Sequence, residues 1–508
     1  MKNRIKQYLL AASMCVGLTA CSDFFEPIPG VQFGLDETFA SKQRTEEYLN
    51  NVYSYVREVT DAIHPNTYGG IFTEASLDGA NRWNKTYAEW TNGSFNSASA
   101  QASEYFSKYY QAIAKASTFI QNVDKCTEAA ASTRGKWKSE ARALRAYYYF
   151  ELLRLYGPIP LIGEDPIPLD ASLEELIKER NSVDECVNFI ATELQSAIDS
   201  GDLLQRAGKA NLGRMDVATC MALKAKLYLY WASPLFNGNT DQASVKNKDG
   251  KQLFPQTEDN SKWAQARDAY ERFMTFATGQ GYKLTEVYTN GKLDPYASCR
   301  AAGEFFTTTW EAVDELIFVK LRDLYDYTYW VCPKFTDFQD TDVTGGGGYY
   351  TTQETVDLFF TKDGLTIEED PGYDKFEVIP SANNFTSGRY YDPNNPSRLY
   401  FDADKSKVLK QWKDREPRFY VNITYSGSIW LNEGKYNEEM RTDFTNGANG
   451  TCGKSKASGD CPDSGYLIRR GAKASNNNGS KHFSPVLRLA DMYLGYAEAL
   501  CMCSDLDN

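Results

Sequence analysis

The sequence predicts a mainly α-helical protein that carries a large loop-rich insertion with a few short strands. Apolar residues recur at three- and four-residue steps in several segments before about residue 278 and again near residue 490, as in amphipathic helices. Between 279 and 484, aromatic and polar residues alternate with Gly, Asn, Asp and Pro, without that period. Helices joined by short turns, with Ala and aromatic residues on facing stripes, predict tetratricopeptide-like stacking.

A long helix over 134–156 is the element around which the other helices are expected to pack. Gly157 and Pro158 follow it, and they end helices because glycine adopts the left-handed conformation and proline cannot continue the hydrogen-bond ladder. The three consecutive tyrosines 147–149 point in different directions around a helix, so this helix should be buried on several sides. Its apolar stripe consists of Trp137, Ala141, Leu144, Tyr148, Leu152 and Leu155.

The same periodicity predicts helices over 42–57, 101–122, 183–198, 215–231, 262–277 and 485–500. Residues 418–425 are expected to form a strand, because aromatic and β-branched residues alternate there with polar ones. We divide the chain into a signal peptide (1–20), a lipidated cysteine with its tether (21–40), a helical domain (41–278), a loop-rich ligand-binding subdomain (279–484) and the start of a last helical unit (485–508).

The N-terminal segment carries the signature of an exported protein. Basic residues precede an apolar stretch over 8–18, which is too short to span the ~30 Å of a bilayer core. The sequence Leu-Thr-Ala-Cys at 18–21 resembles a bacterial lipobox, which predicts a lipid anchor on Cys21. The alternative is an ordinary signal peptide cleaved near Ala20. The mature chain is expected to be held at a membrane by its lipid.

Composition excludes some classes of partner. The net charge of −13 argues against a nucleic-acid partner, because phosphate binding requires a basic patch. The glycine run 345–348 lacks the lysine and the strand–helix context of a phosphate-binding loop, so no cofactor is expected. The 34 Tyr, 27 Phe and 9 Trp exceed what a core of ordinary composition holds, which leaves aromatic side chains for a binding surface.

The cysteines are too scattered for a disulfide scaffold. Cys452 and Cys461 flank a loop rich in Gly, Ser and Lys, and a local disulfide between them is a candidate in an oxidising compartment. Cys186 and Cys220 lie on apolar helical stripes and are expected to be buried thiols. No metal site is expected at Cys501 and Cys503, since no histidine is near them in the sequence.

Several motifs together resemble the SusD/RagB family. They are RALRAYYYFELLRLYGPIPL at 142–161, CSDFF at 21–25, TVDLFFTKDG at 355–364, REPRFY at 415–420 and RLADMYLGYAE at 488–498. Members are outer-membrane lipoproteins of Bacteroidetes that bind glycans or other nutrients beside a SusC-like TonB-dependent transporter. The resemblance also implies further helices after the last motif, so we expect the last repeat here to be truncated and to lack its partner helix.

The residues argue for binding rather than catalysis. His64 and His482 both lie among polar residues, and neither accompanies a G-x-S-x-G or H-E-x-x-H motif. Glycoside hydrolysis needs only two carboxylates, but the acidic run 368–370 is interpreted as solvated surface. A surface glycoside hydrolase remains an alternative, as does a structural lid or peptide-binding subunit of the transporter.

Sugar rings stack on flat aromatic side chains, and their hydroxyls pair with amide and guanidinium groups. Asn81, Arg82 and Trp83 supply this combination in one predicted loop, although Trp83 could equally fold against the helices. Trp330 ends an aromatic cluster over 325–330 that could instead be a half-buried strand. The remaining ligand-binding candidates are Tyr296 and Tyr349. The predicted function is non-catalytic capture of oligosaccharide for a SusC-like transporter. The resemblance implies that this transporter contacts the helical face of the protein.

Overall fold

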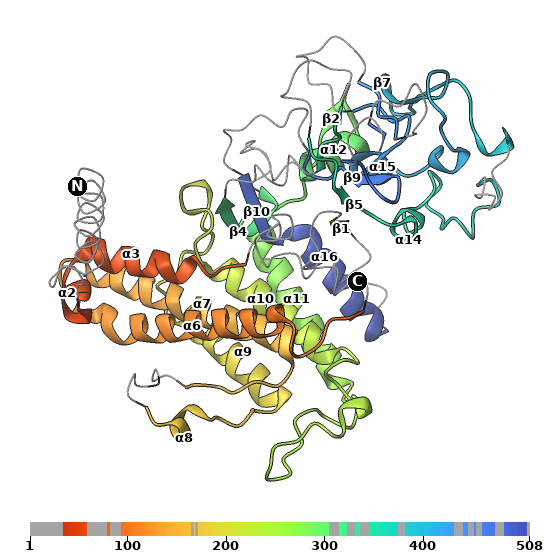
Figure 1. Ribbon diagram of the computed structural model, residues 1–508. Coiled ribbons are helices and arrows are strands. Elements are labelled where there is room, and N and C mark those ends of the chain that lie inside the picture. Colours follow the sequence, from red (N-terminus) through yellow and green to blue (C-terminus); the bar gives the residue numbers. More distant parts are fainter. Residues whose placement is uncertain are drawn as a thin grey trace, which may run out of the picture.

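The computed structural model contains a helical lobe and a loop-rich lobe, which lie side by side in Figure 1. Helices dominate the chain and the strands are short, so the mainly α prediction is confirmed. The residues described are 34–57, 79–81, 93–163, 167, 171–303, 314–322, 331–335, 345–373, 382–430, 440–444, 452–453, 460–472 and 482–504.

The helical lobe is a series of helices in which successive members pack on one another. Helix α6 packs on α7, α7 on α9, α9 on α10, α10 on α11, and α11 on α16. This pairwise order is the tetratricopeptide-like stacking that the sequence predicts. The helices are α2 (Leu35–Ala40), α3 (Lys42–Tyr53), α6 (Ala100–Asn122), α7 (Ala131–Tyr156), α8 (Leu173–Leu176), α9 (Val183–Asp199), α10 (Val217–Ala232), α11 (Ser261–Gly279) and α16 (Leu489–Met502).

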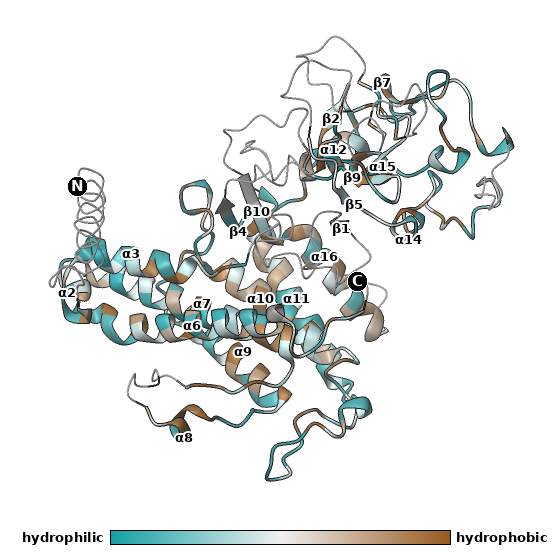
Figure 2. Ribbon diagram, in the orientation of Figure 1, coloured by the Kyte–Doolittle hydropathy of each residue, from teal (hydrophilic) through white to brown (hydrophobic). Residues whose placement is uncertain are grey.

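Helix α7 is buried on all sides, as its three tyrosines predict. Tyr147, Tyr148 and Tyr149 are each 1% exposed or less. The Tyr148 hydroxyl donates to the Val52 carbonyl on α3 at 2.5 Å, and the Tyr149 hydroxyl accepts from the Ile162 N–H at 3.0 Å. The rings therefore fix α7 against elements on two of its faces. Figure 2 shows the mixture of apolar and polar residues along these packed helices.

Charged side chains on α7 are buried and paired. Arg145 is fully buried and its guanidinium lies 2.5 Å from the Glu193 carboxylate on α9, which Arg142 also approaches at 3.0 Å. Such pairs compensate the cost of removing both charges from water only where the geometry is good. Sequence periodicity gives no sign of these pairs, because it marks only the apolar stripe.

Part of the segment 21–40, which the sequence assigns to the tether, is helical. Leu35–Ala40 forms helix α2. Phe39 is fully buried, with its ring centroid 5.3 Å from that of Tyr48 and 5.7 Å from that of Phe119. The physical reason is this one aromatic anchor, which docks α2 on α3 and α6.

A two-stranded antiparallel sheet, β4 (Leu316–Arg322) with β10 (His482–Arg488), lies where the lobes meet (Figure 1). Ile317, Phe318 and Leu487 from these strands join the core of the helical lobe. The predicted helix 485–500 begins later, at Leu489, because Pro485 and the residues after it pair with β4.

The loop-rich lobe has its own aromatic core, in which Tyr400 and Tyr420 stack with ring centroids 3.9 Å apart. Residues 418–425 were predicted as a strand, but Pro417 begins a helix and only the last three residues are extended. Its helices are α12 (Pro295–Gly303), α14 (Gln353–Asp357) and α15 (Pro417–Asn422). Its strand pairs are β2 (Tyr288–Thr289) with β3 (Lys292–Leu293) and β6 (Arg389–Asp392) with β7 (Asn395–Asp402).

A four-stranded antiparallel sheet collects distant parts of the chain in this lobe. Its order is β1 (Ala80–Asn81), β5 (Tyr349–Tyr350), β9 (Tyr466–Ile468) and β8 (Ile423–Tyr425). The sheet therefore brings the segment around residue 80 beside the segments around residues 350 and 466.

Replacement of Glu193 by Leu is expected to lower the free energy of unfolding by roughly 3–5 kcal/mol, because Arg145 is left buried without its carboxylate. Urea unfolding followed by far-UV circular dichroism measures this. Replacement of Asp36 by Asn is the control, since it breaks the exposed pair with Lys125 and should cost less than about 1 kcal/mol. Equal losses of unfolding free energy in the two variants would show that the buried pair contributes no more stability than the exposed pair.

Candidate functional site

A partly open cavity of about 450 Å³ in the loop-rich lobe combines aromatic rings with arginine side chains. We call it the α12 cavity. Its walls come from α12, from β7 and from the residues that follow β8 and β9. Its volume falls in the range of ligand pockets in proteins. The lining residues are Val287, Tyr296, Ala297, Arg300, Ala301, Arg398, Leu399, Ile429, Trp430 and Arg469.

One wall of the α12 cavity is held by a neutralised arginine. The guanidinium of Arg398 lies 2.9 Å from the Asp294 carboxylate and 2.5 Å from that of Asp392, and both aspartates are buried. It also covers the ring of Tyr296, 4.2 Å from the ring centroid. Arg398 thus joins α12 to the β6–β7 pair, and its charge is used within the fold.

A second arginine, Arg469, enters the cavity directly after β9. Its side chain is buried, and its guanidinium lies 5.6 Å from the centre of the Trp430 ring. Burial lowers the pKa of Arg469, and the nearby positive charge of Arg300 lowers it further. Trp430 is only 1% exposed, so its ring packs within the fold, and the guanidinium beside it carries N–H donors of the kind that pair with sugar hydroxyls.

The structure unites some of the predicted ligand-binding residues. Tyr296 lines the α12 cavity. Asn81 and Tyr349 are register partners in the β1–β5 pair, so two segments chosen separately from the sequence are neighbours. Tyr349 is only 3% exposed, because it lies inside the four-stranded sheet, and its role in ligand binding stays a prediction.

Other predicted residues fall outside the part of the chain that the structure describes. These are Arg82, Trp83 and Trp330, together with the lipidation site Cys21. Their roles stay predictions.

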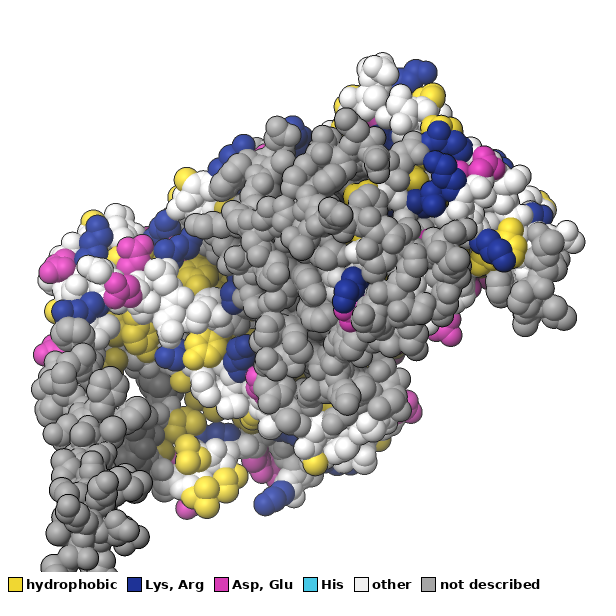
Figure 3. Space-filling view, turned by 45° about the horizontal axis from the view of Figure 1, so that its top comes forward, with side chains coloured by type: hydrophobic (Ala, Val, Ile, Leu, Met, Phe, Trp, Pro, Cys, Tyr) yellow, Lys and Arg dark blue, Asp and Glu magenta, His cyan; other side chains and the backbone are white. Residues whose placement is uncertain are grey.

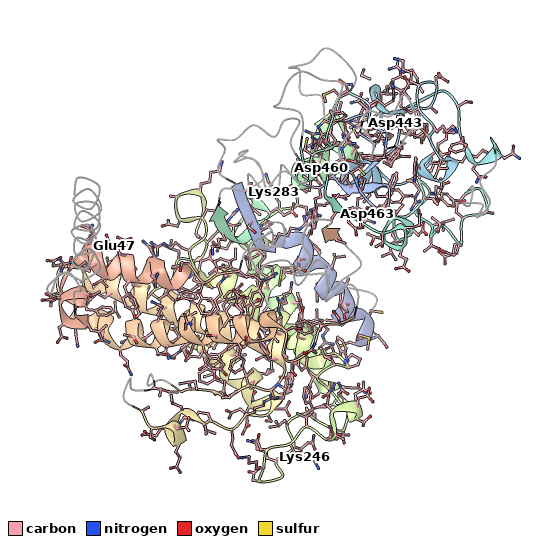
Figure 4. All side chains as sticks on the ribbon, viewed as in Figure 1. Glu47, Lys246, Lys283, Asp443, Asp460 and Asp463 are labelled. Carbon is pink, nitrogen blue, oxygen red and sulfur yellow. The ribbon has the colours of Figure 1, made fainter. Side chains whose placement is uncertain are left out.

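The cysteine predictions have different outcomes. Cys186 and Cys220 are fully buried, as expected. Cys452 and Cys461 are buried, and their pairing stays a prediction. The Asp443 carbonyl accepts a hydrogen bond from the Cys452 N–H at 2.9 Å, and Asp460 directly precedes Cys461. Asp443 and Asp460 are labelled in Figure 4.

Trp430, Arg398 and Arg469 were not identified from the sequence. Trp430 and Arg469 each follow a short apolar strand, but many residues of the chain do so. Only the tertiary structure brings the three residues together in the lining of one cavity. The interpretation of 368–370 as surface agrees with the structure, since Glu368 and Glu369 are exposed.

A larger and mostly apolar groove of about 670 Å³ lies on the helical lobe. Its walls are α6 and the segment around α8, including Phe106, Tyr110, Leu176 and Ile177. Figure 2 shows α8, which carries two leucines and two glutamates, at the edge of the lobe. With few polar donors, this groove suits apolar ligands or protein partners better than sugars. No described helix is long and apolar enough to cross a membrane.

Two family models match the chain and together cover most of it. The model described as SusD family matches residues 315–508, and the model described as starch-binding, associating with outer membrane, matches residues 32–229. A curated relative, a SusD-like protein of Bacteroides ovatus, is 27% identical over 175 residues. That match covers 33% of this chain and spans only 30% of the relative's length.

Solved structures with this fold cover nearly the whole chain. The protein BT4246 superposes with a TM-score of 0.73 at 23% identity, covering 92% of this chain and 79% of its own. A SusD-like protein from Bacteroides fragilis gives 0.66 at 21%, with coverages of 94% and 79%. A SusD-like carbohydrate binding protein from the same species gives 0.61 at 18%, with coverages of 92% and 75%. At these identities the likeness establishes the fold.

The Asp294–Arg398 pair predicts sensitivity of the loop-rich lobe to acid. Burial alone would raise the pKa of Asp294, but hydrogen bonds from Arg398, the Ala297 N–H and Thr289 lower it to about 2. A lowered folded-state pKa stabilises the fold above the unfolded value of about 3.9, and this stabilisation is lost as the pH falls from about 4 through 2.

We therefore expect the near-UV circular dichroism of the lobe to weaken over that window. The variant Arg398→Gln should lose this near-UV signal at a higher pH than the wild type does. The variant Lys405→Gln changes a largely exposed lysine and should lose the signal at the same pH as the wild type. Coincident acid transitions in all three proteins would contradict this role of the pair.

Proposed function

This chain belongs to the SusD/RagB family, and we propose that it captures oligosaccharide without catalysis and delivers it to a SusC-like TonB-dependent transporter of the outer membrane. The observation that carries the binding part is the α12 cavity, in which the rings of Tyr296 and Trp430 meet guanidinium groups. The proposal includes anchoring by a lipid on Cys21, which rests on the lipobox-like sequence at 18–21.

Sugar binding is favoured over other ligands by the mixture of surfaces in the cavity. Tyr and Trp offer apolar area with few rotatable bonds, and arginines offer several N–H donors in a fixed plane. A purely apolar ligand would leave those donors unpaired and so would bind at a cost. Loops that follow short strands supply these residues, and such loops on a rigid scaffold commonly carry binding sites.

Single replacements of the candidate aromatic residues test whether they bind sugar. Titration calorimetry of the protein beginning at Ser22 against a panel of oligosaccharides should give saturable heat, with no product detected by chromatography. Tyr296→Ala, Trp83→Ala and Trp330→Ala should each weaken binding by about tenfold, the amount that one lost ring contact is worth. Tyr288→Ala is the control, because this tyrosine is exposed and lies outside the cavity lining.

Two results would count against the proposal. Product formation that is lost on a single Asp or Glu replacement would identify a hydrolase. A folded protein that binds no oligosaccharide would favour a lid or a peptide-binding subunit.

The helical lobe is the surface that we assign to the transporter. Its support is the apolar groove beside α8 and the exposure of apolar side chains there, with Leu173 73% and Ile177 68% exposed. Exposed apolar side chains beside a groove are typical of surfaces that another protein covers. Binding of sugar on one lobe and of transporter on the other would allow both at once.

The double variant Leu173→Glu, Ile177→Glu is expected to abolish co-purification with a co-expressed SusC-like transporter, because two buried charges at an interface would be unpaired. Its melting temperature and its sugar binding should stay unchanged. Leu358→Glu is the matched control, since Leu358 is 70% exposed on the other lobe. Retention of the transporter by the double variant would move the contact away from α8.

A further inference from the structure

Arg469 is a buried cation that has no ion-pair partner among the described residues. Its side chain is 7% exposed, and its Nε atom is buried without a hydrogen-bond partner. Its guanidinium contacts the face of Trp430, but no ion pair joins it to any carboxylate among the described residues. A buried charge without a partner is costly, so it calls for an explanation.

The other buried arginines of the described chain are compensated. Arg145 pairs with Glu193, and Arg415 donates to the carbonyls of Val356 and Phe359 at 2.6 Å each. Within the same cavity, Arg398 has two aspartates. Arg469 differs from all three, although Arg145 and Arg415 are buried to a comparable degree.

A second cation makes the location more favourable for an anion. Arg300 on α12 lines the same cavity, and its charge acts on Arg469 strongly enough to lower the pKa of Arg469. Two like charges that face one space repel each other, and an anion between them would relieve that repulsion. Lys and Arg side chains are also visible over the loop-rich lobe in Figure 3, although the chain as a whole carries a charge of −13.

The cavity is too large for a small inorganic anion alone. Its volume of about 450 Å³ leaves room for a ring beside the charged group, and Tyr296 and Trp430 line it. A planar guanidinium matches a carboxylate through two parallel hydrogen bonds, and it pairs with sulfate oxygens in a similar way.

We propose that the α12 cavity binds an anionic sugar, with the carboxylate or sulfate of that sugar paired to Arg469. This inference rests on the proposed function and narrows it to acidic oligosaccharides. Arg469 is thereby a specificity-determining residue, because its buried charge has no carboxylate partner among the described residues and a bound anion would supply one.

The test uses calorimetry with matched acidic and neutral ligands. Oligomers of galacturonate, alginate and hyaluronan are each titrated with their carboxylates free and ionised, and again as the uncharged methyl esters. Sulfated galactan oligomers and neutral gluco-oligosaccharides are titrated as further ligands. At least one acidic oligomer should bind at least about tenfold more tightly than its neutral counterpart, as expected for a charge-assisted hydrogen-bonded pair. Preference for the free uronates identifies the carboxylate, and preference for the sulfated galactan identifies the sulfate.

The variant Arg469→Met keeps the length of the side chain over Trp430 and removes the charge. It should bind the acidic oligomer no better than the neutral one, and its melting temperature should be equal to or above that of the wild type, because an uncompensated buried charge has been removed. Lys405→Gln removes one exposed positive charge from the same lobe and should retain the preference. Arg469→Lys should retain part of the preference for acidic oligomers, since lysine keeps the positive charge but lacks the planar guanidinium.

Three outcomes would overturn the inference. Binding of neutral oligosaccharides without tighter binding of acidic ones would overturn only this inference and would leave the proposed function standing. An acidic preference that survives in Arg469→Met would place the anion elsewhere. A folded protein that binds none of the ligands would overturn both proposals.

Discussion

The burial of helix α7 on every side is the constraint on which the rest of the structure depends. A helix in the centre of a helical stack must satisfy its polar side chains inside the protein, since water does not reach them. Arg145 does so through Glu193 on α9, and Glu140 does so through Arg214 and the hydroxyl of Tyr53. These partners lie on three neighbouring segments, so α7 fixes the relative positions of the elements that surround it.

The position of the loop-rich lobe follows from that helical frame. Strands β4 and β10 pack their apolar residues into the helical core, and α16 starts directly after β10. On α16, Gly495 lies so close to the Tyr270 hydroxyl of α11 that a Cβ atom would be 2.2 Å from it. The absence of a side chain there lets the two helices approach, which seats the last helix and the strand that precedes it.

The α12 cavity shows two uses of arginine in one place. Arg398 is neutralised by two buried aspartates and holds α12 to the β6–β7 pair, so its role is structural. Arg469 contacts an aromatic ring and has no carboxylate partner among the described residues, which is a cost that a ligand can offset. The comparison of charge compensation between neighbouring side chains therefore separates residues that stabilise the fold from residues that bind.

The sequence by itself determined the helices, because amphipathic periodicity and the Gly157–Pro158 stop are local properties; α7 runs from Ala131 to Tyr156, with Gly157 at a φ of 69°. It also determined the family through contiguous motifs. Only the tertiary structure decided the site: Tyr296, Trp430 and Arg469 are far apart in the chain and meet through short strands whose pairing no local pattern encodes. It also decided which charges are buried and paired, since that depends on neighbours from other segments. The helix at 35–40 was missed for the same reason, because its one anchor, Phe39, is held by rings from α3 and α6.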